Sequence, residues 1–318
     1  MALGIYDTVL DTVGDTPLIR LHRVGGPERA RVLVKLESVN PGGSIKDRIG
    51  LALIRAAEAD GRLKPGGTIV EATAGNTGIA LAQAAAVLGY RSIFVVPAKM
   101  SQDKIRLLKA YGAAVEVVPD VGRDDPRHYH RVARQLAESI PGAAYMGQFE
   151  AAANPEAHYA TTGPEIWAAT RGDIAMVVAG AGTGGTITGI GRYLKEQNPA
   201  VEVVGADPEG SIFTGPPVHP FQIEGMGEDY IPETLDQAAV DRWVKVTDAE
   251  AFRMARALAR EEGLMVGGSS GAIVKVALDE ARRVTREGYV VAICPDTGRN
   301  YLSNIFAEEG DTEGPRWS

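Results

Sequence analysis

Short β-branched segments alternate with longer helical patterns along most of the chain, and this alternation restricts the fold more than any other feature of the sequence. The expected strands lie at 31–36, 68–71, 92–96, 114–118, 176–179, 201–206 and 290–294. The expected helices lie at 45–60, 78–88, 101–111, 128–139, 185–197, 249–262 and 272–286. Strands that alternate with helices form βαβ units on a mostly parallel sheet, and apolar strands such as MVVA at 176–179 indicate helices on both faces. We therefore expect an α/β fold.

The composition excludes several functional classes. The 318 residues include 33 basic and 41 acidic side chains, and the resulting net charge of −8 argues against a duplex-binding surface. A single cysteine, Cys294, excludes an internal disulfide framework and thiolate metal clusters. The first residues lack a basic stretch, and no apolar run is long enough for a membrane span. We expect a soluble, cytoplasmic protein without nucleic-acid or membrane partners.

Glycine is the residue type that departs most from an average composition. The chain contains 38 glycines, well above the usual share of about 7%, and many of them directly follow expected strands. Open parallel sheets bind ligands at the carboxyl ends of their strands, so turns at these positions are the candidate binding sites. Four such turns, at 40–48, 71–78, 180–186 and 267–271, carry residues of chemical interest.

The first of these turns, NPGGSIKDR at 40–48, carries a lysine into the start of a helix. Ser44 is suited to the N-cap, and Asp47 three residues later completes a pattern like a capping box. Lys46 then lies beside the positive end of the helix dipole, which together with burial lowers the pKa of its amine. Imine chemistry needs such a partly neutral lysine, although the motif by itself also fits an ordinary exposed lysine on an amphipathic helix.

Two further turns place hydroxyl and amide groups at a helix start. EATAGNTG at 71–78 either forms a carboxylate site from backbone N–H groups and hydroxyls, or is a plain helix start capped by Asn76 or Thr77. GGSSG at 267–271 either turns a serine hydroxyl toward a ligand or uses Ser270 as a helix cap. The residues leave both pairs of alternatives open.

The turn GAGTGGT at 180–186 is the richest in glycine. Four glycines and two threonines directly before a helix form a phosphate cradle of backbone amides at the positive end of the helix dipole. The same residues match the dinucleotide fingerprint G-x-G-x-x-G, and Asp207 at the end of the next strand is a candidate for holding a ribose. The additional glycine and the flanking threonines favour a single phosphate monoester.

Other residue types predict little chemistry. His128 and His130 are two residues apart, and no histidine has ligand-like spacing or a cysteine partner, so we expect no metal site. Neither Ser269 nor Ser270 lies in a nucleophile elbow. Cys294 ends the apolar run VVAIC and is expected to be a buried, inert thiol.

Together, and in this order, the four turns resemble one family, the fold type II enzymes that use pyridoxal 5′-phosphate (PLP), in the cysteine synthase and cystathionine β-synthase branch. The resemblance covers residues 11–306. Four further stretches are closest to the cystathionine β-synthase catalytic core: AHYATT at 157–162, DPEGSI at 207–212, EGMGEDYIPETLD at 224–236 and PDTGRNY at 295–301.

This resemblance implies a fold like that of the tryptophan synthase β subunit, with two domains of mostly parallel, doubly wound sheets. A smaller mobile domain would comprise residues 38–148. A larger PLP-binding domain would comprise residues 1–37 plus 149–306, followed by a flexible tail at 307–318. A homodimer is expected from the family.

The resemblance also implies roles for individual residues. Lys46 would bind the PLP aldehyde and move the substrate α-proton, Asn76 would bond the 3′-oxygen of the ring, and Ser269 would meet the ring nitrogen. The phosphate would be bound by Gly182, Thr183, Gly184, Gly185 and Thr186. The substrates would be bound by Thr73, Ala74, Gly75, Asn76, Thr77, Gln148, Glu224 and Gly225. Because a serine cannot keep the ring nitrogen protonated, the electron sink is weak and loss of a β-leaving group is favoured.

The activity that this resemblance implies is a β-replacement through an α-aminoacrylate. Serine or O-acetylserine would react with homocysteine to give cystathionine, and Glu224 is the main pointer to this acceptor. A cysteine synthase that uses sulfide is the alternative, and a serine or threonine dehydratase-like lyase is a weaker one. The fingerprint at 180–185 by itself leaves open a nicotinamide-dependent oxidoreductase or a nucleotide-binding module. O-acetylserine is the favoured donor, because acetate leaves without being protonated.

The sequence departs from the family pattern in three respects. Ala74 stands where the family usually has serine. In this respect the chain resembles the acetylserine-using bacterial variants. Glu228 stands where animal synthases often have tyrosine, which bears on the pocket for the second substrate. We also expect the chain to lack the N-terminal haem segment and the C-terminal regulatory repeats of those enzymes, and therefore to bind no haem.

Overall fold

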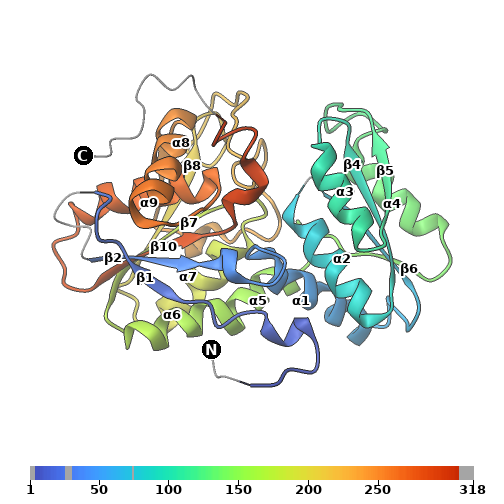
Figure 1. Cartoon of the computed structure of the whole chain (residues 1–318), viewed down its shortest axis with the longest axis horizontal. Coiled ribbons are helices and arrows are strands. Elements are labelled where there is room, and N and C mark those ends of the chain that lie inside the picture. Colours follow the sequence, from blue (N-terminus) through green and yellow to red (C-terminus); the bar gives the residue numbers. More distant parts are fainter. Residues whose placement is uncertain (1–3, 26–30, 74, 308–318) are drawn as a thin grey trace.

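Two β-sheets organise the protein. The computed structural model describes residues 4–25, 31–73 and 75–307. Figure 1 shows the larger sheet on the left, the smaller sheet on the right, and the helix α1 (Lys46–Ala59) between them.

The larger sheet has six strands in the order β1-β2-β10-β7-β8-β9. Only β1 runs antiparallel to its neighbour, and every other adjacent pair is parallel. The strands are β1 (Leu18–Arg20), β2 (Val32–Leu36), β7 (Ile174–Gly180), β8 (Glu202–Pro208), β9 (Arg242–Val246) and β10 (Tyr289–Cys294).

The smaller sheet has four parallel strands in the order β5-β4-β3-β6. These strands are β3 (Thr68–Ala72), β4 (Arg91–Pro97), β5 (Ala114–Val118) and β6 (Ala143–Tyr145). In both sheets the parallel strands end at the edge that faces the region between the sheets, where the glycine-rich turns lie.

Helices cover both faces of each sheet. On the larger sheet, α8 and α9 pack on one face and α6 and α7 on the other. On the smaller sheet, α2 and α3 lie on the face that α1 also contacts, and α4 covers the opposite face. The helices are α2 (Asn76–Leu88), α3 (Gln102–Ala110), α4 (Tyr129–Ser139), α5 (Ala153–Ala157), α6 (Gly163–Thr170), α7 (Gly185–Gln197), α8 (Asp248–Ala257) and α9 (Gly268–Ala281). Shorter segments are 3-10 helical at η1 (Val9–Thr12), η3 (Glu37–Val39), η5 (Gln237–Ala239) and η7 (Gly298–Tyr301), and π-helical at η4 (His158–Thr162) and η6 (Leu258–Glu262).

The expected α/β fold with largely parallel sheets is confirmed, and every expected strand and helix forms: β5 and α7 have the expected ends, and the other elements have shifted ends. The apolar strand β7 is buried along six of its seven residues, as covering on both faces requires. The expected helix at 272–286 is wrong at both ends: α9 begins at the glycines of the fourth turn and stops at Ala281. The sequence did not predict β1, β6, β9, α5 or α6. β1 and β6 have only three residues each, too few for a period of two to be visible.

Cys294 ends β10 and is completely buried. Burial raises the pKa of its thiol to about 12, so the prediction of an inert, buried cysteine is confirmed. None of the helices in the part of the chain that the structure describes has the length and apolar character of a membrane span.

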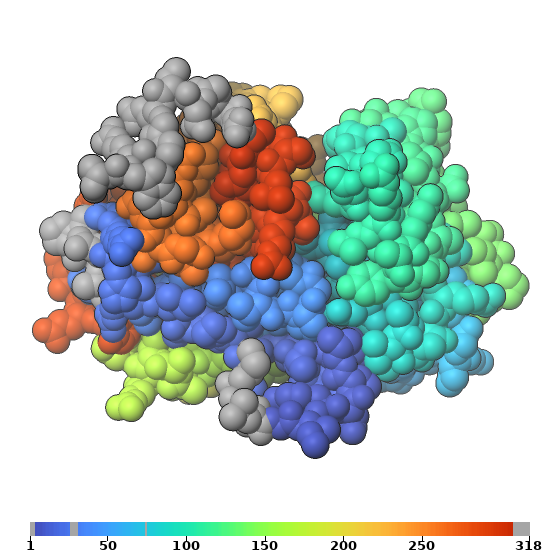
Figure 2. All heavy atoms as spheres, in the orientation of Figure 1, coloured from blue at the N-terminus to red at the C-terminus, as the bar shows by residue number. Residues whose placement is uncertain are grey.

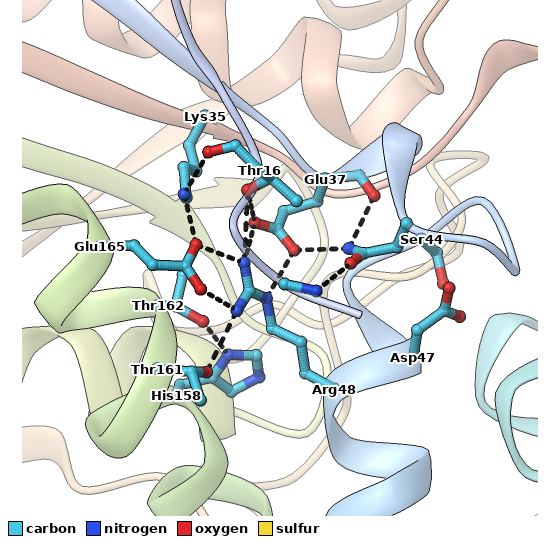
Figure 3. A network of polar contacts seen from close by, with 12 residues as sticks. Thr16, Lys35, Glu37, Ser44, Asp47, Arg48, His158, Thr161, Thr162 and Glu165 are labelled. Atoms are coloured by element: carbon cyan, nitrogen blue, oxygen red, sulfur yellow. Dashed lines mark hydrogen bonds and ion pairs between the residues drawn. The ribbon is translucent and has the colours of Figure 1, made fainter. Parts of the chain in front are cut away.

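A buried ion cluster anchors α1 to the larger sheet (Figure 3). Arg48 of α1 donates from Nε to Glu37 Oε2 at 2.8 Å and from Nη1 to Glu165 Oε1 at 2.7 Å. Lys35 of β2 donates to Glu165 Oε2 at 2.6 Å. Burial raises the pKa of Glu165, but the hydrogen bonds and charges of Arg48 and Lys35 outweigh it and hold this pKa at about 2. The cluster thus keeps the carboxylate of Glu165 charged inside the protein.

Replacing Arg48 by alanine should lower the free energy of unfolding by about 3–5 kcal/mol, because Glu37 and Glu165 lose their shared cation in a buried position. Denaturant titration measures this loss. The matched control is Arg106→Ala, which removes an exposed ion pair with Asp103 and should cost less than about 1 kcal/mol. Equal losses for the two variants would show that the cluster does not anchor α1.

Candidate functional site

A cavity of about 530 Å³ lies between the two sheets, and all four glycine-rich turns contribute to its wall. Figure 2 shows the residues near 300, in red, facing the teal segment of the smaller sheet across a notch in the surface. The predicted site residues in this wall are Lys46, Thr73, Gly75, Asn76, Thr77, Gln148, Gly182, Thr183, Glu224, Gly225 and Ser269. Gly184 and Thr186 line a smaller adjoining pocket, which shares Lys46 and Ser269 with the cavity. Gly185 begins α7 beside them, and Ala74 lies outside the described residues.

The lysine turn places Lys46 at the first residue of α1, but not through the expected capping box. Ser44 Oγ accepts a hydrogen bond from the Lys46 N–H at 3.2 Å, whereas Asp47 turns back and accepts from the Gly42 N–H. The capping box is therefore wrong, because Asp47 holds the glycine turn that precedes the helix instead of its N-cap. Burial raises the pKa of Asp47 to about 7.

The amine of Lys46 faces the cavity from the helix start. Burial lowers its pKa, and the negative charge of Asp296 opposes this effect without reversing it. The expected lowering is thus confirmed, with burial as the largest cause. An amine in this state loses its proton more readily than an exposed lysine does, and so becomes a nucleophile or a base.

The glycine loop after β7 has the geometry of an anion cradle. Gly184 adopts a left-handed conformation, with φ of +83°, which brings the loop into α7. A Cβ on Gly185 would lie 2.0 Å from Asn154 Oδ1, and a Cβ on Gly182 would lie 2.9 Å from the Gly225 carbonyl oxygen. Side chains are therefore excluded at these two positions, and backbone N–H groups remain there at the start of α7. This donor set fits a phosphate.

The dinucleotide interpretation finds less support in the structure. Asp207 is completely buried at the end of β8, and its Oδ2 accepts hydrogen bonds from both the N–H and the hydroxyl of Thr214, at 2.8 and 2.9 Å. This carboxylate holds its own loop and does not face the cavity as a ribose ligand would.

The AGNTG turn starts α2 at Asn76, two residues earlier than expected. Neither Asn76 nor Thr77 caps the helix: Thr73 Oγ1 accepts from the N–H groups of Gly75 and Gly78 instead. Asn76 and Thr77 consequently point elsewhere. Thr77 donates its hydroxyl to Gln148 Oε1 at 2.6 Å, so the structure brings together two residues that were predicted to surround one carboxylate.

The fourth turn places Ser269 at the start of α9, buried in the wall of the cavity. The N-cap of α9 is Gly267, and no side chain caps it. Ser270 is therefore not a helix cap, and of the two alternatives the ligand-facing serine is the one compatible with this arrangement.

Sequence reasoning missed Asp296 and Tyr301 as site residues. Asp296 is buried in the wall, and its Oδ2 accepts from Asn76 Nδ2 at 2.8 Å and from the Tyr301 hydroxyl at 2.6 Å. Burial raises the pKa of Asp296. The available signal was its position two residues after β10, where parallel strands present ligand-binding groups.

Charged and aromatic side chains from the sides of both sheets also line the cavity. Lys104 of α3, beside the smaller sheet, forms an ion pair with Glu224, which lies on the side of the larger sheet. Glu228 and Tyr129 also line the cavity. Burial, with a smaller contribution from Asp229, raises the pKa of Glu228 to about 8. Lys104 and Tyr129 carried no recognisable motif in the sequence.

Within the described ranges 4–25, 31–73 and 75–307, no group of three or more His, Cys, Asp or Glu side chains could hold a metal ion.

Comparison with known proteins relates the chain to one enzyme family. The family profile described as "Pyridoxal-phosphate dependent enzyme" matches residues 9–296. Cystathionine beta-synthase of Oryctolagus cuniculus is 46% identical over 313 residues, which cover 96% of this chain and 57% of that protein. The chain thus spans little more than half the length of such relatives. The O-acetylserine dependent cystathionine beta-synthase of Bacillus subtilis is 43% identical, and the match covers 97% of this chain and 100% of that protein.

Solved structures give the same relationship. An O-ureido-L-serine synthase superposes with a TM-score of 0.90 at 38% identity, covering 98% of both chains. The O-acetylserine dependent cystathionine beta-synthase of Helicobacter pylori superposes with a TM-score of 0.88 at 40% identity, covering 95% of this chain and 99% of that one.

Replacing Gly185 by alanine should lower the free energy of unfolding by about 1–3 kcal/mol, since the new methyl group collides with the amide of the fully buried Asn154. Thermal or denaturant unfolding measures the change. Gly122→Ala is the control, because a Cβ there meets nothing within 4 Å, and it should leave stability within about 1 kcal/mol. An unchanged stability in the Gly185 variant would contradict the close approach of loop and Asn154.

Proposed function

We propose an activity on the premise that this chain belongs to the pyridoxal-phosphate dependent enzymes, in the branch of the cystathionine β-synthases and cysteine synthases, and uses PLP. The proposed reaction is a β-replacement that joins O-acetylserine, or serine, with homocysteine to give cystathionine. The observation that carries the proposal is the convergence of Lys46, the glycine loop and the Thr77–Gln148 pair on one cavity. A substrate carboxylate and a cofactor phosphate are thereby proposed to bind beside the Lys46 amine.

Each turn is proposed to take one part of the cofactor or substrate. When bound, PLP supplies the electron sink that allows an α-proton and a β-leaving group to depart. Lys46 binds the cofactor aldehyde, then holds the α-proton on Nζ and returns it, which its lowered pKa supports. Asn76 and Ser269 contact the ring oxygen and nitrogen. The loop at 182–186 binds the phosphate.

The substrate carboxylate is proposed to bind at the AGNTG turn, residues 73–77, together with Gln148. Asn76 and Lys104, on the side of the smaller sheet, contact Asp296 and Glu224 on the side of the larger sheet. We propose that residues 38–148 form a mobile domain whose sheet, moving relative to the anchored α1, closes on the carboxylate through these contacts and excludes water from the cavity. The larger domain, a homodimer and a cytoplasmic location are proposed from the family resemblance.

Homocysteine is the proposed acceptor because Glu224 lies at the cavity mouth. Homocysteine carries an ammonium group that a carboxylate can pair with, whereas sulfide has no such group. Lys104 forms an ion pair with Glu224 in the structure, so the ammonium group of homocysteine would compete with this lysine for the Glu224 carboxylate. Sulfide is the alternative acceptor.

O-acetylserine is the proposed donor. A relative that matches over nearly all of both chains is named for its dependence on O-acetylserine, and Ala74 leaves the AGNTG turn without the serine hydroxyl that the family usually has. Acetate also leaves without an acid to protonate it.

Lys46→Ala should lower the rate of cystathionine formation by at least about 10³-fold, because the variant lacks both the covalent attachment point and the base. Steady-state assays with O-acetylserine and homocysteine measure the rate. Lys109→Ala is the control, since this lysine is exposed near the end of α3. Undiminished turnover in the Lys46 variant would refute the proposed function.

Glu224→Gln should lower kcat/KM for homocysteine by about 10- to 100-fold, the expected value of a lost hydrogen bond to a charged group. The value for sulfide should change by less than about threefold, because sulfide has no ammonium to pair with. Parallel assays with both acceptors measure the two effects, and Glu209→Gln, at an exposed position, is the control. If wild-type protein prefers sulfide, or if both acceptors lose equally, the homocysteine assignment is wrong.

A further inference from the structure

Two polar side chains, Asn154 and His158, lie directly behind the glycine loop. His158 belongs to the stretch AHYATT at 157–162, but the sequence analysis assigned no role to either residue. Asn154 belongs to α5 and His158 begins the π-helical segment η4. Both are buried, His158 completely. Each contacts the hydroxyl of one threonine of the loop: Asn154 reaches Thr183 and His158 reaches Thr186.

The contacts of Asn154 determine the direction of the Thr183 hydroxyl. Asn154 Nδ2 donates one hydrogen to the Gln148 carbonyl oxygen at 2.8 Å and the other to Thr183 Oγ1 at 2.9 Å. A carbonyl oxygen can only accept, so the amide nitrogen must face Gln148, and this orients the amide. Gly185 also donates its N–H to Thr183 Oγ1, at 3.4 Å. The oxygen therefore accepts twice, and its single proton is left to donate elsewhere.

The contacts of His158 leave one choice to be made. Nδ1 lies 2.9 Å from Thr162 Oγ1, and Nε2 lies 3.2 Å from Thr186 Oγ1. Burial, followed by the nearby charges of Arg48 and Lys46, holds the pKa of His158 well below its usual value. The ring is therefore neutral, and one nitrogen donates while the other accepts. The threonine that accepts from the donor nitrogen keeps its own hydroxyl proton free to donate to another group.

We propose that His158 is a positioning residue that donates from Nε2 to Thr186 Oγ1 and accepts at Nδ1 from the hydroxyl of Thr162. The Thr186 hydroxyl is then held as an acceptor from behind, as Thr183 is held by Asn154. Both threonines present their protons to an anion in the loop. The proposal rests on the proposed function in that this anion is the phosphate of PLP.

The same π-helical segment also contacts the helix that carries Lys46 (Figure 3). Thr161 Oγ1 accepts from Arg48 Nη1 at 3.1 Å and donates to the Ala157 carbonyl oxygen. A π-helical turn of this kind occurs often at functional sites. Here it places His158 toward the loop and Thr161 toward α1, so one segment contacts both Thr186 of the loop and Arg48 of α1.

The direct test is the protonation of His158 in the wild-type protein. Histidine-labelled apoprotein is observed by ¹⁵N NMR, with the His158 signal assigned by comparison with His158→Gln. The expected state is a neutral ring with its proton on Nε2, before and after addition of PLP. A proton on Nδ1 overturns the proposal, and this readout needs neither catalysis nor a variant that folds poorly.

The second test measures binding of PLP and of pyridoxal, which lacks the phosphate. His158→Leu removes the donor and should raise the Kd of PLP by about 3- to 12-fold, the value of one neutral hydrogen bond, while the Kd of pyridoxal stays unchanged. His158→Gln keeps a donor nitrogen at the Nε2 position and should restore PLP binding to within about threefold. Exposed His219 provides the control variant His219→Leu. Equal weakening of both ligands would reveal a merely structural role and overturn the proposal.

Coupling to the threonine completes the experiment. In a Thr186→Val background, His158→Leu should cause no further loss of PLP affinity, because the hydroxyl that it orients is already absent. Additive losses contradict the proposal. If wild-type protein does not bind PLP at all, the proposed function itself fails, whereas wild-type binding with an unaffected His158→Leu variant removes only the role of His158.

Discussion

The site depends on the buried guanidinium of Arg48. Arg48 follows Lys46 by two residues on α1, and it is held by Glu37 beside β2 and by Glu165 of α6. A buried charge in this position tolerates no alternative placement, because moving the helix would leave carboxylates unpaired in the interior. The amine of Lys46 therefore meets the cavity at a defined point between the two sheets.

A second constraint is the close approach of α7 to α5 and η4. A Cβ on Gly189 would lie 2.2 Å from the Pro155 carbonyl oxygen, and one on Gly185 would lie 2.0 Å from Asn154 Oδ1. Glycine at these two positions permits α5 and η4 to pack directly on α7. This packing brings Asn154 and His158 to the threonines of the loop. The glycines of the loop thus serve the groups behind it as well as the anion in front of it.

Much of the fold and part of the site could be predicted from the sequence. The β-branched run at 176–179 and the glycines after it indicated a buried strand with a binding turn, and β7 and its loop form there. The capping box of Ser44 and Asp47 was wrong, because the Asp47 carboxylate found a closer donor in Gly42. The three-residue strand β6 was missed because so short a segment shows no periodicity. Asp296 was missed because a lone acid after a strand carries no spacing that distinguishes it.

The sequence by itself located the four glycine-rich turns and the helices that they open. Periodicity and glycine content act locally, so they can be read without knowledge of the fold. Only the tertiary structure decided which side chains meet. Asn76 contacts Asp296 across 220 positions of the chain, and Lys104 contacts Glu224 across 120. Such pairings follow from how the two sheets pack around α1. The local sequence pattern contains no information about them, because the partners are close in the folded structure but far apart along the chain.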